Sequence, residues 1–230
     1  ALVGLLLTGA CSSPTTLPSQ STTQPMSVDA KLGEWNGRLT YLDDEPVSMS
    51  VAPTDSLLYV ALAIQDRDLI RSVAKKGLIV WVDPSGKQQR TYGIQHPLGL
   101  QTQRTDEGGS GSRSSDGASD GGAGPSGASR QPGTESMLEQ VSLEELAILR
   151  QGTPQLRVPA RFSTGLRAKV RLDPGSMIYE LAIPVAEDTT ANRQHALRAS
   201  LGRTVGIGLE TPESETEEQS LDNPNQGVPS

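Results

Sequence analysis

The chain has 230 residues, a formal net charge of −7, 34% hydrophobic residues and 3% aromatic residues. With 24 Gly and 16 Pro, much of it cannot supply a packed core, and we expect a single domain with long unstructured additions. The acidic balance disfavours nucleic acid as a partner, since phosphate binding needs clustered Lys and Arg and no basic face is visible. A single cysteine excludes an internal disulfide framework.

Residues 1–11, ALVGLLLTGAC, form an apolar run that ends in small residues and a cysteine. This pattern indicates a secretory h-region with its processing site. The run is too short to span a bilayer, which needs about 20 apolar residues. No initiator Met and no basic segment stand before it, so we expect further residues to precede Ala1.

Residues 8–11, TGAC, resemble a bacterial lipobox, which implies that Cys11 is acylated. Thr8 departs from the aliphatic residue usual at that place, although Leu7 serves in a shifted alignment. The alternatives are an ordinary secretory signal with an incidental cysteine and a buried helix with a small apolar thiol. Residues 12–25, rich in Ser, Thr, Pro and Gln, favour the lipoprotein because they are typical of a tether. Ser12 in place of Asp implies delivery to the outer membrane.

Alternation with period two predicts half-buried strands over residues 47–51 and 58–64. Residues 66–73 predict a short helix with Asp66 as its N-cap, which we expect to be a connector rather than part of the core. Residues 77–82, GLIVWV, predict a central strand covered on both faces. A turn at 83–86 ends it, and 90–95 return as its hairpin partner.

Residues 101–135 carry almost no apolar side chain, so we expect a disordered insertion between two strands of one domain, with a domain boundary as the alternative. Residues 142–150 fit either a capped helix or a helical turn leading into a strand. Residues 166–172 predict a strand whose wet face carries Arg167, Lys169 and Arg171.

Residues 177–183 predict the next strand, which Pro184 ends. Residues 204–210 predict another strand, whose Gly206 and Gly208 permit a neighbouring element to approach closely. Residues 213–230 predict an acidic, disordered tail that serves for solubility rather than for a partner. Eight or so short strands with one or two short helices predict an all-β, antiparallel β-sandwich of immunoglobulin-like architecture over residues 26–212.

Residues 27–35, SVDAKLGEW, resemble the opening of the DOMON-like domains, which include family 9 carbohydrate-binding modules. Residues 55–66, DSLLYVALAIQD, 81–86, WVDPSG, and 179–184, YELAIP, are similar to later strands of that family and stand in the family's order. The resemblance covers about 26–97 and 137–212, although Ala30 and Gly33 depart from the opening pattern. It implies a DOMON-like sandwich that binds a glycan without catalysis.

Family members that bind sugar stack it between exposed loop aromatics. The resemblance places Trp35 and Trp81 at framework positions, and Tyr59 and Tyr179 lie on predicted strands, so no spare aromatic pair is evident. We therefore expect Trp35 and Trp81 to be buried. The alternative function is a structural or protein-binding envelope lipoprotein without a sugar site.

Three aspartates, Asp66, Asp68 and Asp83, are candidate calcium ligands, but turn and helix-cap roles are favoured because no dense Asp/Asn/Gly loop is present. A haem pair as in some DOMON domains would join a histidine to a methionine. The only histidines are His96 and His195, and the methionines considered are Met49 and Met177. Ordinary packing explains each of these four, so we expect no metal and no cofactor.

Catalytic patterns are missing from the sequence. Ser163 lies in no G-x-S-x-G turn, and Glu144 and Glu145 would point to different faces of a helix. We therefore predict no enzyme and no catalytic residue. The expected location is the cell envelope, on the outer membrane through a lipid on Cys11, with a carbohydrate or an envelope protein as partner and no nucleic acid.

Overall fold

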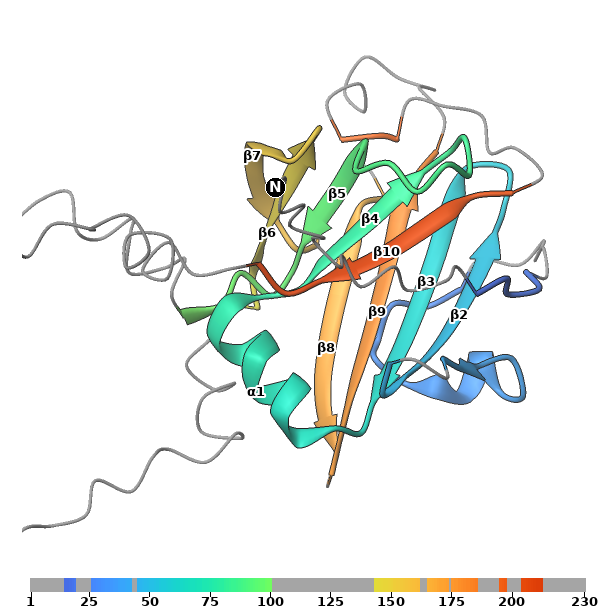
Figure 1. Cartoon of the computed structure of the whole chain (residues 1–230), viewed down its shortest axis with the longest axis vertical. Helices are drawn as coiled ribbons and strands as arrows, with labels where there is room; N and C mark the ends of the chain where they lie inside the picture. The colour runs from blue at the N-terminus through green and yellow to red at the C-terminus, as the bar shows by residue number, and fades with distance from the viewer. Residues whose placement is uncertain are drawn as a thin grey trace, which may run out of the picture.

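Two antiparallel sheets of five strands face each other in the computed structural model (Figure 1). The structure describes residues 15–19, 26–42, 45–100, 143–161, 165–173, 175–185, 195–197 and 204–212. The first sheet has the order β1 (Thr40–Tyr41), β2 (Val47–Pro53), β3 (Leu57–Ile64), β9 (Ser176–Pro184) and β8 (Arg167–Asp173). The second sheet has the order β10 (Gly206–Glu210), β4 (Ile79–Asp83), β5 (Tyr92–Gln95), β6 (Glu145–Arg150) and β7 (Thr153–Pro159). The predicted all-β sandwich is confirmed.

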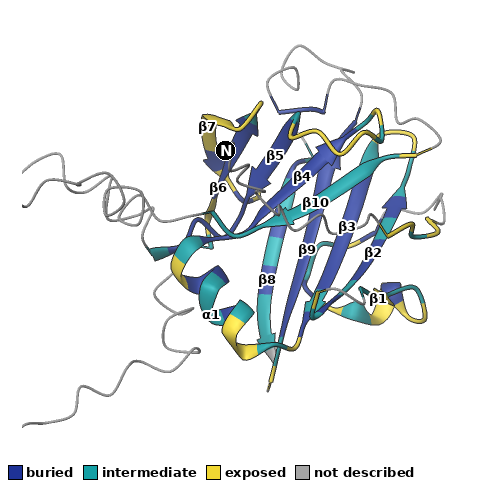
Figure 2. Cartoon of the chain, in the orientation of Figure 1, coloured by how far each residue is buried: buried dark blue, intermediate teal, exposed yellow. Residues whose placement is uncertain are grey.

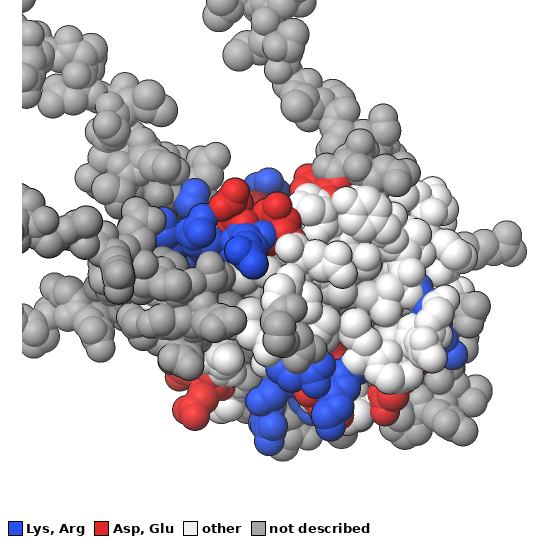
Figure 3. All heavy atoms as spheres, turned by 90° about the horizontal axis from the view of Figure 1, so that it is seen from below, with Lys and Arg blue, Asp and Glu red and all other residues white. Residues whose placement is uncertain are grey.

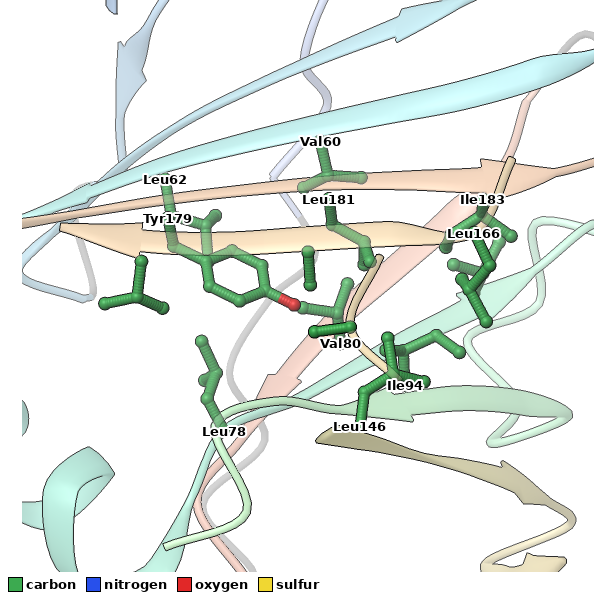
Figure 4. Close-up of a cluster of buried hydrophobic side chains, with 14 of the residues drawn as sticks. Val60, Leu62, Leu78, Val80, Ile94, Leu146, Leu166, Tyr179, Leu181 and Ile183 are labelled. Carbon is green, nitrogen blue, oxygen red and sulfur yellow. The ribbon is translucent and has the colours of Figure 1, made fainter. Parts of the chain in front are cut away.

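The core lies between the two sheets because one side of each strand is apolar. From the first sheet, Figure 4 shows Val60, Leu62, Tyr179, Leu181 and Ile183 pointing toward Leu78, Val80, Ile94 and Leu146. These alternate positions of β3 and β9 are those that period-two spacing assigns to one face. Their opposite faces lie on the outside of the sandwich, and that is where candidate binding surfaces must be sought.

The helix α1 (Arg67–Lys76) begins where predicted, with Asp66 Oδ1 accepting a hydrogen bond from the Leu69 backbone N–H at 2.7 Å. The expectation that it is only a connector is wrong. Ile70, Val73 and Ala74 are buried and belong to the main core. Their i, i+3, i+4 spacing puts them on one helix face, which packs against β9.

The open choice at residues 142–150 resolves to a strand, β6, which pairs with β5 and β7. The sequence did not predict β7, which contains Pro154 and Pro159. It is the last strand of the second sheet, where one side needs no ladder hydrogen bonds and proline is tolerated. Two other short elements were not predicted, the two-residue strand β1 and the 3₁₀ helix η1 (Leu32–Trp35).

Both sheets combine strands from before residue 101 and after residue 142: β9 pairs with β3, β6 with β5, and β10 with β4. Within the described ranges, no helix has the length and apolar character needed to cross a membrane. Cys11, the predicted insertion 101–135 and the predicted tail 213–230 lie outside the described residues, and the predicted tether 12–25 is described only at 15–19.

Candidate functional site

Trp35 and Glu180 join two segments that are far apart in the sequence. Glu180 lies on the outer face of β9 and is 1% exposed, and the segment 26–39 covers it. Its Oε2 accepts hydrogen bonds from the backbone N–H groups of Asp29 (2.8 Å) and Ala30 (2.7 Å), and its Oε1 accepts one from Trp35 Nε1 (2.8 Å). Trp35 is 1% exposed. The opening segment is therefore held to the sheet by one buried carboxylate.

Burial raises the pKa of Glu180, and the nearby Asp29 carboxylate acts in the same direction. The hydrogen bonds from Ala30, Trp35 and Asp29 partly offset this rise. A perturbed carboxylate is a common mark of a functional site, but here all three donors come from the covering segment. We therefore assign Glu180 a structural role.

Trp81 is the centre of a second cluster, on the outer face of the second sheet. Its indole Nε1 donates to Glu210 Oε2 at 2.7 Å, and Arg90 forms an ion pair with the same oxygen at 3.1 Å. A Cβ added at Gly93 would lie 2.5 Å from Trp81 Cζ3, and one added at Gly208 would lie 3.4 Å from Trp81 Cβ. Gly93 makes room for the indole, whereas a Cβ at Gly208 would make only an ordinary contact with Trp81. Of the two glycines predicted to permit a close approach, Gly206 has the tighter surroundings, since its added Cβ would lie 3.3 Å from Asp83 Cβ.

Both tryptophans are buried, as predicted, since Trp81 is 6% exposed. Tyr59, Tyr92 and Tyr179 are also buried, and of the aromatic residues in the described ranges only Tyr41, on β1, is exposed. Figure 2 shows how continuous the buried region is along the central strands. Two facing exposed rings, which a sugar clamp requires, are absent from the part of the chain that the structure describes.

The candidate calcium ligands have separate structural roles. Asp66 caps α1, and Asp68 pairs with Arg71 one helical turn later. Asp83 is 2% exposed and accepts hydrogen bonds from Ser85 and from the Lys87 and Gln89 backbone N–H groups. Burial favours a higher pKa for Asp83, but these hydrogen bonds outweigh it and lower the pKa below its usual value. Among the described residues, no three His, Cys, Asp or Glu side chains are grouped for a metal ion.

His96 is completely buried where β5 ends. Its Nε2 donates to the Leu143 carbonyl at 3.2 Å, and its ring lies 5.8 Å from the ring of Tyr179. Burial lowers the pKa of His96 to about 4, so the imidazole is neutral at pH 7. His96 Nδ1 and the Tyr179 hydroxyl are buried without a hydrogen-bond partner among the described residues.

The other residues considered for cofactor binding or catalysis are placed separately. Tyr92 Oη donates to the His195 carbonyl at 2.6 Å. Met49 and Met177 belong to the main core. Glu144 and Glu145 are exposed at the start of β6. Ser163 lies outside the described residues.

A row of basic residues lies along β8, the last strand of the first sheet. Ala168 and Val170 point into the core, so Arg167, Lys169 and Arg171 lie on the outer face. Arg161 forms an isolated antiparallel bridge with Arg167, which places its side chain on the same face. Figure 3, viewed from the end at which α1 lies, shows Lys and Arg in clusters that have Asp and Glu beside them. We call Arg161, Arg167, Lys169 and Arg171 the basic row.

Among the described residues no carboxylate forms an ion pair with Arg161, Arg167 or Lys169. The register sets Lys169 opposite Glu180, but the oxygens of Glu180 are taken by the opening segment. The expectation of no basic face is thus wrong at this edge. Residues 146–172 contain six basic and no acidic residues. This local excess of positive charge could have predicted the basic row, but the net charge of the whole chain is negative.

β8 also has backbone groups that no other described strand pairs with. The Ala168 N–H donates outward to the Ala160 carbonyl at 2.9 Å, which covers the beginning of the strand. Because direction alternates along a strand, the N–H and C=O groups of Val170 and Leu172 point to the same outer side. In the described ranges no further strand pairs with β8 on that side. This free edge, beside the basic row, is the candidate functional site.

Comparison with known proteins adds no relative: no model of a known protein family matches the chain, and no curated protein is detectably similar to it.

Proposed function

We propose that this protein is a non-catalytic, DOMON-like β-sandwich, held at the cell envelope by a lipid on Cys11, that binds acidic, extended polypeptide segments at the free edge of β8. The observation that carries the proposal concerns the described residues only: no described strand pairs with the outward backbone groups of Val170 and Leu172, and no described carboxylate forms an ion pair with Arg167 or Lys169.

Strand addition explains how one edge supplies both affinity and selectivity. An added strand would form main-chain hydrogen bonds with the outward groups of Val170 and Leu172. Its alternate side chains would stand beside Lys169 and Arg171, because Arg161 already lies opposite Arg167. Opposite charges directly across from these two residues are favourable by about 0.2–1 kcal/mol each. The preferred ligand therefore carries Glu or Asp at every second position.

A binding role without catalysis accords with how the polar groups of the fold are used. Asp66, Asp83 and Glu180 all accept hydrogen bonds from nearby backbone N–H groups. Glu210 accepts from Trp81 and pairs with Arg90. These carboxylates stabilise turns, caps and covering segments, whereas Arg167 and Lys169 have no such structural partner among the described residues.

The proposal is tested by fluorescence anisotropy with the full chain carrying Cys11→Ser, which removes the acylation site. The probe is a labelled ten-residue peptide with Glu at alternate positions, and the matched peptide has the same composition with its Glu residues in one block. We expect the alternating peptide to bind at least fivefold more tightly. Lys169→Glu should abolish this preference, whereas Lys75→Glu on the exposed side of α1 should preserve it. Equal binding of the two peptides would refute strand addition.

Glycan binding is the second candidate, and the exposed ring of Tyr41 supports it. Tyr41 is 59% exposed and offers one face on which a sugar could stack. A glycan array with the same protein, compared with Tyr41→Ala, tests this role. Binding that Tyr41→Ala removes and Lys169→Glu spares would favour the glycan over the peptide.

The proposed anchor is tested in cells. Cys11→Ser in the full precursor should abolish acyl labelling and move the protein to the soluble fraction. Acyl labelling that persists in this variant would exclude Cys11 as the site.

A further inference from the structure

We propose that Leu17 docks the predicted tether onto the sandwich, so that a lipid on Cys11 holds one particular side of the protein close to the bilayer surface. The inference rests on the proposed function, because it takes Cys11 as the anchored residue. It adds an interaction surface, since the part of the sandwich that Leu17 contacts then faces the lipid headgroups.

Leu17 is the one hydrophobic residue in the predicted tether, because residues 12–25 otherwise contain Ser, Thr, Pro and Gln only. A segment made of those four residue types alone is typical of a chain that stays free of its domain. The structure instead places Leu17 half-buried against the main core, whereas its neighbours in 15–19 are exposed. The single apolar side chain of the segment is therefore the one that contacts the sandwich.

The local sequence favours this contact. Pro18 restricts the preceding Leu17 to extended backbone, so little conformational freedom remains to be lost when the side chain docks. Leu17 also stands only nine residues before Met26, which is buried in the same cluster as Trp35. A side chain tethered at such a short separation has an effective concentration on the order of millimolar, so even a weak apolar contact forms.

Leu17 and Met26 contact different parts of the sandwich. Met26 belongs to a cluster on the outer face of the first sheet, together with Trp35 and Tyr59. Leu17 packs against the main core, which lies between the two sheets. A tether that is free up to Met26 would leave the sandwich from that outer face, whereas a tether docked at Leu17 leaves it from the margin of the core. Docking therefore changes which side is turned toward the lipid.

Docking also shortens the path between the lipid and the sandwich. Leu17 follows Cys11 by six residues, and Met26 follows it by fifteen. Because an extended chain spans at most about 3.3–3.6 Å per residue, the longest path is about 20 Å when the tether is docked and about 50 Å when it is free. The docked protein is therefore held next to the headgroups.

The experiment uses the full chain, with the Cys11 thiol coupled to a maleimide headgroup lipid in phosphatidylcholine vesicles. Coupling occurs at one site because Cys11 is the only cysteine, and it supplies an anchor whether or not cells acylate this residue. Energy transfer from Trp35 and Trp81 to dansyl-labelled headgroups then reports how close the sandwich lies to the bilayer.

Two insertion variants test the docking and keep Leu17 intact. Each receives the same ten-residue Gly/Ser linker, one between Ser13 and Pro14 and the other between Ser21 and Thr22. The linker before Leu17 should lower the transfer efficiency by roughly a factor of two or more, because the longest path grows from about 20 Å to about 55 Å. The linker after Leu17 should leave it unchanged, since the free energy of closing a loop grows slowly with loop length. Equal losses from the two linkers would overturn the proposal.

Substitutions provide a second readout. Leu17→Ser removes the apolar contact and should lower the transfer efficiency as the linker before Leu17 does. Leu156→Ser is the matched control, because Leu156 is 36% exposed on β7, outside the tether. Circular dichroism checks that both variants are folded. Transfer that Leu17→Ser leaves at the parent's value would also overturn the proposal.

Failure of this inference is distinguishable from failure of the proposed function. Acyl labelling in cells and peptide binding at β8 are measured separately, and neither measurement uses the vesicles. Equal losses from the two linkers overturn the docking of Leu17 alone. Acyl labelling that does not depend on Cys11 overturns the proposed anchor, and with it the bilayer as the partner of this surface.

Discussion

Replacing Glu180 by Gln tests the bond that holds the opening segment to the first sheet. The side chain keeps its shape but exchanges one carboxylate oxygen for an NH₂ group. If that group takes the place of Oε1, it faces the Trp35 indole N–H; if it takes the place of Oε2, it faces the N–H groups of Asp29 and Ala30. Either way, at least one buried donor loses its acceptor.

The loss of stability is calculated for the less damaging of the two orientations of the Gln side-chain amide. One buried N–H without an acceptor costs about 1–3 kcal/mol, and two charge-assisted hydrogen bonds become neutral ones, which weakens them further. Removing a buried negative charge returns part of this. We therefore expect Glu180→Gln to lower the free energy of unfolding by about 2–4 kcal/mol.

Urea denaturation at pH 7, followed by circular dichroism, measures this loss. Glu145→Gln, at an exposed glutamate at the start of β6, is the control and should change stability by no more than about 0.5 kcal/mol. Trp35→Phe removes the donor that Glu180→Gln leaves unpaired, so the two changes should be non-additive by about 1 kcal/mol or more. A loss below 0.5 kcal/mol together with strict additivity would refute the assignment of Glu180.

Three further predictions concern the second sheet, the buried histidine and the insertion. Gly93→Ala should destabilise the protein by about 1–3 kcal/mol because the new Cβ would lie 2.5 Å from Trp81 Cζ3. Gly33→Ala is the control and should not destabilise, since the space around Gly33 is open. Equal melting temperatures of the two variants would contradict this prediction. Burial lowers the pKa of His96 from its ordinary value of 6.5 to about 4 in the folded protein. The neutral imidazole therefore contributes about 3 kcal/mol to the free energy of unfolding above pH 6.5, and this contribution is lost as the pH falls toward 4. The pH dependence of unfolding should differ between the parent and His96→Gln in this window, and parallel curves would exclude the effect. Replacing residues 101–135 by a short Gly/Ser linker should change the melting temperature little, and two separate unfolding transitions in the parent would indicate two domains instead.

Strand positions were predictable because burial leaves a local pattern. The alternation at residues 58–64 and the apolar run at 77–82 correspond to β3 and β4. The role of α1 was misjudged because Ile70, Val73 and Ala74 show a helical stripe, but nothing local says what it packs against. β7 was missed because two prolines argue against a strand unless its place at a sheet edge is known.

The candidate site was less predictable, because it depends on sheet order. The charges of Arg167, Lys169 and Arg171 were recognised as one wet face, but only the topology places that face beside a free edge. The link between Glu180 and Trp35 joins positions 145 residues apart. The family resemblance included both segments, but the hydrogen bond between them could not be predicted from the sequence because it forms only in the folded chain.

The central claim is that acidic segments add a strand to β8, and backbone amide hydrogen exchange tests it most directly. The measurement uses the full chain carrying Cys11→Ser, with and without the alternating acidic peptide. Saturation with the peptide should slow exchange at Val170 and Leu172, whose N–H groups point outward. Exchange at Lys169 and Arg171, whose N–H groups point toward β9, should stay unchanged. Unaltered exchange at Val170 and Leu172 in the saturated complex would contradict strand addition at this edge.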